Sequence, residues 1–200
     1  MLSAPQFVLS IRAKALHEVA VRQSGHFTTQ QAITAGFKEN THPYHVTRGN
    51  WIRIHRGLYR LAVFPESRFG QLIGWHLWSR DRKQVPQGVF SHLTALEVHS
   101  LFSETEKRIF ITVPNSFRRT AKTPTMIILH KCDLLANEVI EVEGIRVTSI
   151  KRTLEDTVRS TLLPQDQLSN VFKQVFTMGL VEAAFVTALC GDQLEFIFGR

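Results

Sequence analysis

The chain is short of cysteine, of long apolar runs and, over its first third, of acidic residues. Its 200 residues include two cysteines, Cys132 and Cys190, which are far apart in sequence. A zinc site needs closer ligand spacing, and a secreted disulfide scaffold needs more cysteines. No segment approaches the roughly 20 apolar residues that span a bilayer, and no signal-peptide core follows the N-terminus. We therefore expect a cytoplasmic protein without membrane contacts, bound metal or other cofactor.

Acidic residues are scarce in the first 64 residues, where only Glu18 and Glu39 occur. The same segment contains eight basic residues, so it carries six of the chain's seven net positive charges. The remainder of the chain is close to neutral. A basic module joined to a neutral one favours polyanion binding by the first and a different role for the second.

The apolar spacing of the first third predicts three helices followed by a hairpin. Thr28 and Gln31 have the spacing of a capping box, and Pro43 suits the first turn of a helix. Apolar and basic residues alternate on both sides of Arg56 and Gly57, which is typical of two strands joined by a tight turn. We expect helices over 10–22, 28–36 and 42–49 and a hairpin over 51–61. This order indicates a winged helix-turn-helix.

Pro65, Glu66 and Ser67 interrupt that pattern, and we place a domain boundary there. We expect a winged helix-turn-helix domain at 1–64 and a mixed domain at 66–200, giving an α+β fold class. In the second domain the pattern predicts helices over 69–79, 91–99, 151–158, 164–178 and 180–190, and strands over 108–113, 125–130 and 144–150.

A helix-turn-helix inserts one helix into the major groove, which is about 12 Å wide and admits a single helix. At the start of the third predicted helix and along it, the candidates for reading base edges are Asn40, Thr41, His42, His45 and Arg48. In the hairpin, the candidates for contacting the DNA backbone are Arg53, His55, Arg56 and Arg60. A basic loop further along offers candidates for secondary phosphate contacts, namely Arg118, Arg119 and Lys122. We therefore expect salt-dependent binding to double-stranded DNA.

Motifs of common enzymes are missing: there is no Gly-x-Ser-x-Gly elbow, Walker loop, Gly-x-Gly-x-x-Gly or His-Glu-x-x-His. We therefore predict that the chain is not an enzyme. One alternative is a Mg²⁺-dependent nuclease, for which four acids lie close in sequence: Asp133, Glu138, Glu141 and Glu143. No suitably placed lysine follows them, and an acidic turn between strands also explains them. A protein-interaction module without DNA binding is a further alternative.

Several segments, in order and spacing, resemble AbiE-type antitoxins of type IV toxin–antitoxin systems. Residues 27–32 with Gly36 resemble the second-helix region of that family, and residues 50–61, with their Arg-Gly-Leu-Tyr-Arg-Leu run, resemble its wing. Residues 91–96, 109–114, 143–149 and 152–156 resemble parts of its second domain. The resemblance covers about residues 10–160. The third helix departs from the commoner arrangement by carrying Pro43 and two histidines.

The resemblance implies a DNA-binding transcriptional regulator, and specifically an antitoxin that represses its own operon. In that family the winged helix binds promoter repeats, and the second domain is tied to antitoxin action. The implied partners are promoter DNA and a nucleotidyltransferase-like toxin encoded nearby. Many relatives are stand-alone regulators, so the resemblance leaves the toxin partner open.

Overall fold

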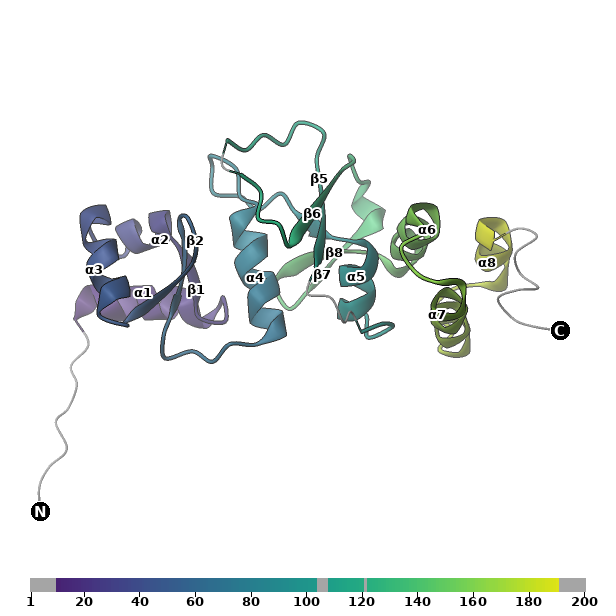
Figure 1. The fold of residues 1–200 in the computed structure, drawn as a ribbon, viewed down its shortest axis with the longest axis horizontal. Coiled ribbons are helices and arrows are strands. Elements are labelled where there is room, and N and C mark those ends of the chain that lie inside the picture. Colours follow the sequence, from purple (N-terminus) through teal and green to yellow (C-terminus); the bar gives the residue numbers. More distant parts are fainter. Residues whose placement is uncertain (1–9, 104–107, 121, 191–200) are drawn as a thin grey trace, which may run out of the picture. The chain divides into compact units, whose positions relative to one another are not determined.

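The computed structural model describes residues 10–103, 108–120 and 122–190 of the chain and divides into two compact units. The first unit is Met1–Pro86 and the second is Gln87–Arg200. Both contain helices and strands, which confirms the mixed α+β class (Figure 1). Within the described residues, every helix is too short or too polar to cross a membrane.

The first unit combines helices with a small antiparallel sheet. In chain order its elements are α1 (Ile11–Val21), β1 (His26–Thr28), α2 (Thr29–Thr34), the 3-10 turn η1 (Glu39–Thr41), α3 (His42–Thr47), β2 (Trp51–His55), β3 (Leu58–Leu61) and α4 (Arg68–Trp78). The strand order is β1-β3-β2, so β3 lies in the middle. The three predicted helices and the hairpin are confirmed. Strand β1 was not predicted, because three consecutive buried residues show no alternation.

Local sequence signals begin and end these elements as expected. The Thr28 hydroxyl accepts a hydrogen bond from the Gln31 amide at 3.2 Å, and the Gln31 side chain accepts one from the Thr28 amide at 2.9 Å. This is the predicted capping box at the start of α2. Pro43 lies in the first turn of α3. Gly57, at φ +75°, makes the turn between β2 and β3, a conformation that other residues adopt only with strain.

The core of the first unit is built around Trp51, which is 3 % exposed. Its ring centroid lies 4.9 Å from that of Phe27, 5.1 Å from Phe37 and 5.7 Å from Tyr59. These rings come from β1, from the segment after α2 and from β3. One side chain of β2 therefore connects most of the unit, and buried aromatic residues of this size dominate core energetics.

Helix α4 belongs to the first unit, so the boundary between the units falls between Pro86 and Gln87 rather than at 65–67. A Cβ atom at Gly74 of α4 would come 2.9 Å from the buried His26 ring of β1. Just after α4, the Arg80 side chain donates a hydrogen bond to the Gly57 carbonyl at 3.2 Å. Pro65 interrupts the local sequence pattern, but the contacts of the first unit continue beyond it through α4 and Arg80. With this boundary the first unit carries a net charge of +8 and the second −1.

The second unit contains a five-stranded mixed sheet with helices. Its elements are β4 (Val89–Phe90), α5 (His92–Val98), β5 (Ile109–Val113), β6 (Ile127–Lys131), η2 (Ala136–Glu138), β7 (Val139–Val142), β8 (Ile145–Thr148), α6 (Ile150–Ser160), α7 (Gln165–Thr177) and α8 (Ala183–Cys190). The strand order is β6-β5-β4-β8-β7, with β5–β6 and β4–β8 parallel and the other pairs antiparallel. The core includes Leu96, Phe110, Leu154 and Phe172. The predicted helices are confirmed, whereas β4 and β7 were not predicted.

Two histidines stack in the interior of the second unit. The His92 and His130 ring centroids are 3.9 Å apart and their planes differ by 22°. His92 Nδ1 lies 2.9 Å from the Ser91 hydroxyl oxygen. Burial lowers the pKa of His92 to about 3, helped by the nearby His130 and Arg152, and burial also lowers the pKa of His130, opposed by Asp156. Both imidazoles are therefore neutral in the folded protein near pH 7.

We expect this pair to make the second unit less stable as the pH falls from 7 to 5. The folded pKa of His92 lies below the unfolded value of 6.5, so the unfolded chain takes up the proton first. Stability is then lost below the unfolded pKa, by up to about 1.4 kcal/mol per pH unit for this residue. Hydrogen exchange of the β5 amides at pH 7 and pH 5 measures the loss. The variant His92→Asn, which tolerates the left-handed backbone at φ +51°, should lose less, and an equal loss in both proteins would contradict the assignment.

Candidate nucleic-acid interface

The basic residues of the first 64 positions lie mostly on the surface. Seven of the eight are exposed: Arg12, Lys14, Arg22, Lys38, Arg48, Arg53 and Arg56. The two acids of this segment, Glu18 and Glu39, are exposed as well. The surface of this part of the chain therefore has an excess of positive charge that can neutralise phosphates.

Helix α3 and the turn before it present polar and aromatic side chains to solvent. Asn40 is exposed in η1. Arg48 is exposed at the end of α3, and its guanidinium carbon lies 5.4 Å from the ring centre of Tyr44, which is 56 % exposed. Thr41 is half-buried, and its hydroxyl donates to the Lys38 carbonyl at 2.7 Å. Asn40 and Arg48 thus remain candidates, and Tyr44 joins them.

The two histidines of α3 face inward, contrary to expectation. His42 is 1 % exposed, and its ring centre lies 5.1 Å from that of Trp51. His45 is half-buried, and its ring stacks on that of Trp51, with the ring centres 4.6 Å apart and an interplanar angle of 20°. Burial lowers the pKa of both imidazoles. Residues 42 and 45 share one helix face, which Trp51 covers, whereas residues 44 and 48 share the opposite one.

Arg53 and Arg56 are the exposed cations of the hairpin. Residues two apart on a strand share a face of the sheet, so Arg53 lies on the same face as Trp51, against which His45 of α3 stacks. Arg56 is next to the turn residue Gly57. The Gly57 carbonyl accepts hydrogen bonds from the Thr29 amide at 3.1 Å and from Arg80, so this turn is fixed to the start of α2.

The other two hairpin candidates are turned into the protein. Arg60 is 6 % exposed, and its side chain donates to the Phe64 carbonyl. It lies on the central strand β3, where β1 and β2 cover both edges. The half-buried His55 ring has its centre 6.1 Å from Trp75 and 6.5 Å from Trp78, both on α4. The alternation of apolar and basic residues predicted a hairpin with one face in solvent. Strand β1 and helix α4 cover parts of it, and the sequence of the hairpin does not show this.

The basic loop candidates lie in the second unit. Arg118 is exposed, and its guanidinium donates to the carbonyls of Asn115 at 2.9 Å and Phe117 at 3.0 Å, so it bends back onto its own loop. Arg119 is half-buried and Lys122 is exposed. The three residues remain candidates for contacts made by the second unit.

Two of the four acids that suggested a nuclease have partners elsewhere in the protein. Asp133 accepts two hydrogen bonds from Asn115, and Glu138 forms an ion pair with Arg152 at 2.7 Å. Glu143 and Gly144 form the turn that joins β7 to β8. Within the described ranges, no three His, Cys, Asp or Glu side chains converge as metal ligands would. Of the four acids, Glu143 lies in a turn between strands as expected, whereas Glu141 lies within β7, Glu138 in η2 and Asp133 after β6.

Neither a protein-family model nor a curated protein matches the chain. Its function must therefore be inferred from the residues and their geometry. The exposed candidates on η1, α3 and the hairpin form what we call the α3–hairpin surface, defined as Asn40, Tyr44, Arg48, Arg53 and Arg56. Helix spacing places Tyr44 on the same face of α3 as Arg48, but it does not show whether that face is exposed. The structure shows that it is, and Tyr44 therefore joins the surface.

Proposed function

We propose that the first unit binds double-stranded DNA as a winged helix-turn-helix, and that the chain is a transcriptional regulator. The observation that carries this proposal is the α3–hairpin surface, whose exposed amide, aromatic and guanidinium side chains suit base reading and phosphate binding in a unit of net charge +8. The element order α1-β1-α2-α3-β2-β3 supports it, because winged-helix domains follow the same order. In such domains the helix that corresponds to α3 enters the major groove.

The exposed side chains suit distinct roles at a duplex. Arg48 has the fork of donors that pairs with guanine, and Asn40 has the amide that pairs with adenine. Tyr44, beside Arg48, offers an aromatic surface for a thymine methyl group. Arg53 and Arg56 suit phosphate contacts, which fix position without reading sequence.

The resemblance to AbiE-type antitoxins supports a more specific role. We propose an antitoxin that represses its own operon in the cytoplasm, with a nucleotidyltransferase-like toxin as partner. The second unit has a net charge of −1, so any phosphate contacts it makes depend on its basic loop and not on an overall excess of cations. It is the better suited of the two units to contact a protein.

Two kinds of variant test DNA binding. A duplex selected from a random pool is titrated over a range of salt concentrations and followed by fluorescence anisotropy. Arg53→Ala with Arg56→Ala should weaken binding to all sequences alike and reduce the salt slope by about 2, because two phosphate contacts are lost. Arg48→Ala should cost about 1–3 kcal/mol and change the preferred sequence.

The matched control is Lys14→Ala with Arg22→Ala, which removes the same charge from α1 and its end. It should change affinity far less than the hairpin variant does. If both double variants weaken binding equally, the positive charge acts without a defined interface. If no duplex is bound even at low salt, the chain is not a DNA-binding protein.

A further inference from the structure

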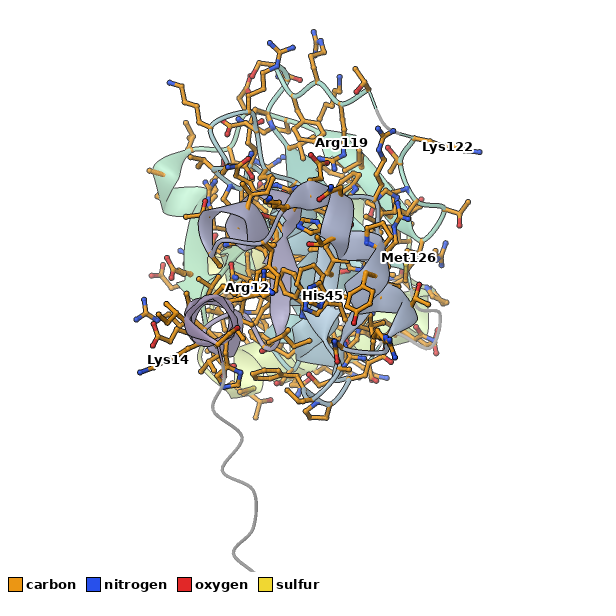
Figure 2. The ribbon with its side chains drawn as sticks, turned by 90° about the vertical axis from the view of Figure 1, so that its left-hand side faces the viewer. Arg12, Lys14, His45, Arg119, Lys122 and Met126 are labelled. Carbon is orange, nitrogen blue, oxygen red and sulfur yellow. The ribbon has the colours of Figure 1, made fainter. Side chains whose placement is uncertain are left out.

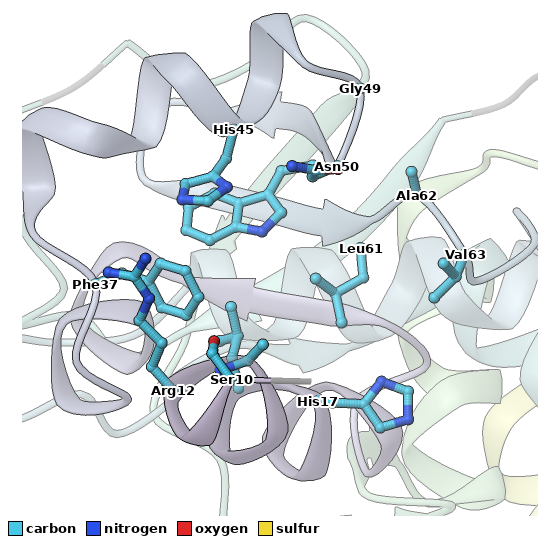
Figure 3. A pocket seen from close by; sticks show the side chains of 13 residues that line it. Ser10, Arg12, His17, Phe37, His45, Gly49, Asn50, Leu61, Ala62 and Val63 are labelled. Atoms are coloured by element: carbon cyan, nitrogen blue, oxygen red, sulfur yellow. The ribbon is translucent and has the colours of Figure 1, made fainter. Parts of the chain in front are cut away.

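A cavity of about 520 Å³ opens in the first unit among α1, α3 and the start of β2 (Figure 3). Small-molecule sites occupy about 300–1,000 Å³. One wall is the stacked pair of His45 and Trp51, and Phe37 adjoins it, with its ring centre 5.1 Å from each of the two. Leu61 and Val63 line the other end. The walls are therefore mainly apolar and aromatic.

Arg12 gives this aromatic cavity a positive charge. Its guanidinium carbon lies 5.1 Å from the centre of the Phe37 ring. Figure 3 shows the Arg12 side chain extending from α1 to Phe37. Figure 2 shows Arg12 and His45 near each other, with Lys14 directed away from them. Among the described residues, none of those lining the cavity is acidic, and none forms an ion pair with Arg12. The charge of Arg12 is therefore available to a ligand.

The combination of flat rings and one guanidinium selects a particular chemistry. Aromatic groups stack on or pack edge-on against Phe37 and His45. A guanidinium binds a carboxylate through two parallel hydrogen bonds, which makes the pair both strong and directional. A cationic ligand would be repelled by Arg12, and a neutral apolar one would leave it unpaired.

We propose that this cavity, the Arg12 pocket, binds a planar aromatic carboxylate. The ring lies against Phe37 and His45, and the carboxylate pairs with Arg12. If the proposed DNA binding is correct, an occupant also alters DNA affinity, because His45 and Trp51 support the buried side of α3 behind Tyr44 and Arg48. By linkage, DNA then changes the affinity for the carboxylate by the same factor.

Calorimetric titration of the full chain with 2-naphthoate tests the pocket directly. We expect saturable binding of one molecule per chain, and at least about tenfold weaker binding of the neutral analogue 2-naphthalenemethanol. Arg12→Gln should remove the difference between the two ligands. Lys14→Gln is the matched control, since it removes one charge from the same helix outside the pocket, and it should change neither affinity. Ala62→Phe, at an exposed position of the pocket wall, should block both ligands.

Several results would overturn the proposal. They are equal affinity for the charged and neutral ligands, unchanged 2-naphthoate binding in Arg12→Gln, and undiminished binding in Ala62→Phe. Binding that weakens as the chain is concentrated would assign the cavity to a second copy of the chain and would overturn it too. Circular dichroism of each variant shows whether it is folded.

DNA binding is measured separately, without 2-naphthoate and then at saturation. A chain that binds 2-naphthoate but no duplex contradicts the proposed function and leaves the pocket established. A chain that binds a duplex but no 2-naphthoate overturns the pocket alone. Equal duplex affinity with and without saturating 2-naphthoate would show that the predicted coupling to α3 is wrong.

Discussion

Replacing Trp51 by alanine is expected to lower the free energy of unfolding of the first unit by about 3–5 kcal/mol. The side chain is almost fully buried and packs against Phe27, Phe37, His42 and His45. Its removal loses the transfer free energy of the ring and leaves a cavity that rigid aromatic neighbours cannot close. Since folded domains have a stability of only about 5–15 kcal/mol, the variant should be close to unfolding.

Urea unfolding followed by the fluorescence of Trp75 and Trp78 measures this loss. Tyr44→Ala is the control, because it removes another aromatic ring from solvent rather than from the core, and should change stability by less than about 0.5 kcal/mol. The two variants should therefore separate folding from recognition, with Tyr44→Ala stable but altered in duplex binding. A loss of under 1 kcal/mol in Trp51→Ala would mean that Trp51 does not organise this core.

Local signals in the sequence were enough to predict most elements of the first unit. The capping box of Thr28 and Gln31, the proline at the start of α3 and the positive φ of Gly57 each depend on residues within a few positions of one another. Such signals act through the backbone and require no knowledge of the tertiary fold. They therefore identify where helices begin and where the hairpin turns.

Which side chains face solvent depended on contacts that the sequence does not display. Arg60 was expected to contact phosphate, but strand β1 places it in the middle of the sheet. The histidines at 42 and 45 were expected to read bases, but Trp51, on the next strand, covers that side of α3. A six-residue helix is too short for its own periodicity to show which face is buried. The sequence also shows no sign of the Arg12 pocket, because its walls come from segments that are far apart in sequence.

The second unit contains a charged network around Arg152, whose members also come from segments that are far apart in sequence. Its guanidinium donates to the Glu138 carboxylate at 2.7 Å, to the Asp156 carboxylate at 2.8 Å and to the Cys132 sulfur at 3.4 Å. Its partners come from η2, from α6 and from the residue after β6. Spacing in the sequence predicts the pair within α6, because Asp156 is four residues from Arg152. It does not predict the other two.

Arg152→Leu is expected to cost the second unit about 3–5 kcal/mol at pH 7, because removing Arg152 leaves the buried Asp156 carboxylate without compensation. Burial raises the pKa of Asp156, and Arg152 opposes that rise. Without Arg152 the pKa of Asp156 in the folded state lies still higher above its unfolded value. The folded variant then takes up a proton more readily than the unfolded chain as the pH falls, so the cost should shrink between pH 7 and pH 5.

Hydrogen exchange of the β5 amides at both pH values measures this cost. Arg159→Leu is the control on the same helix. The Arg159 side chain is 70 % exposed and lies 3.7 Å from Glu155, so its loss should cost less than about 1 kcal/mol. Adding Asp156→Asn to Arg152→Leu should restore part of the stability at pH 7, because the buried charge is then absent. If Arg152→Leu is no less stable than Arg159→Leu, the network contributes nothing to folding. If the cost of Arg152→Leu does not change with pH, the unpaired Asp156 carboxylate is not its cause.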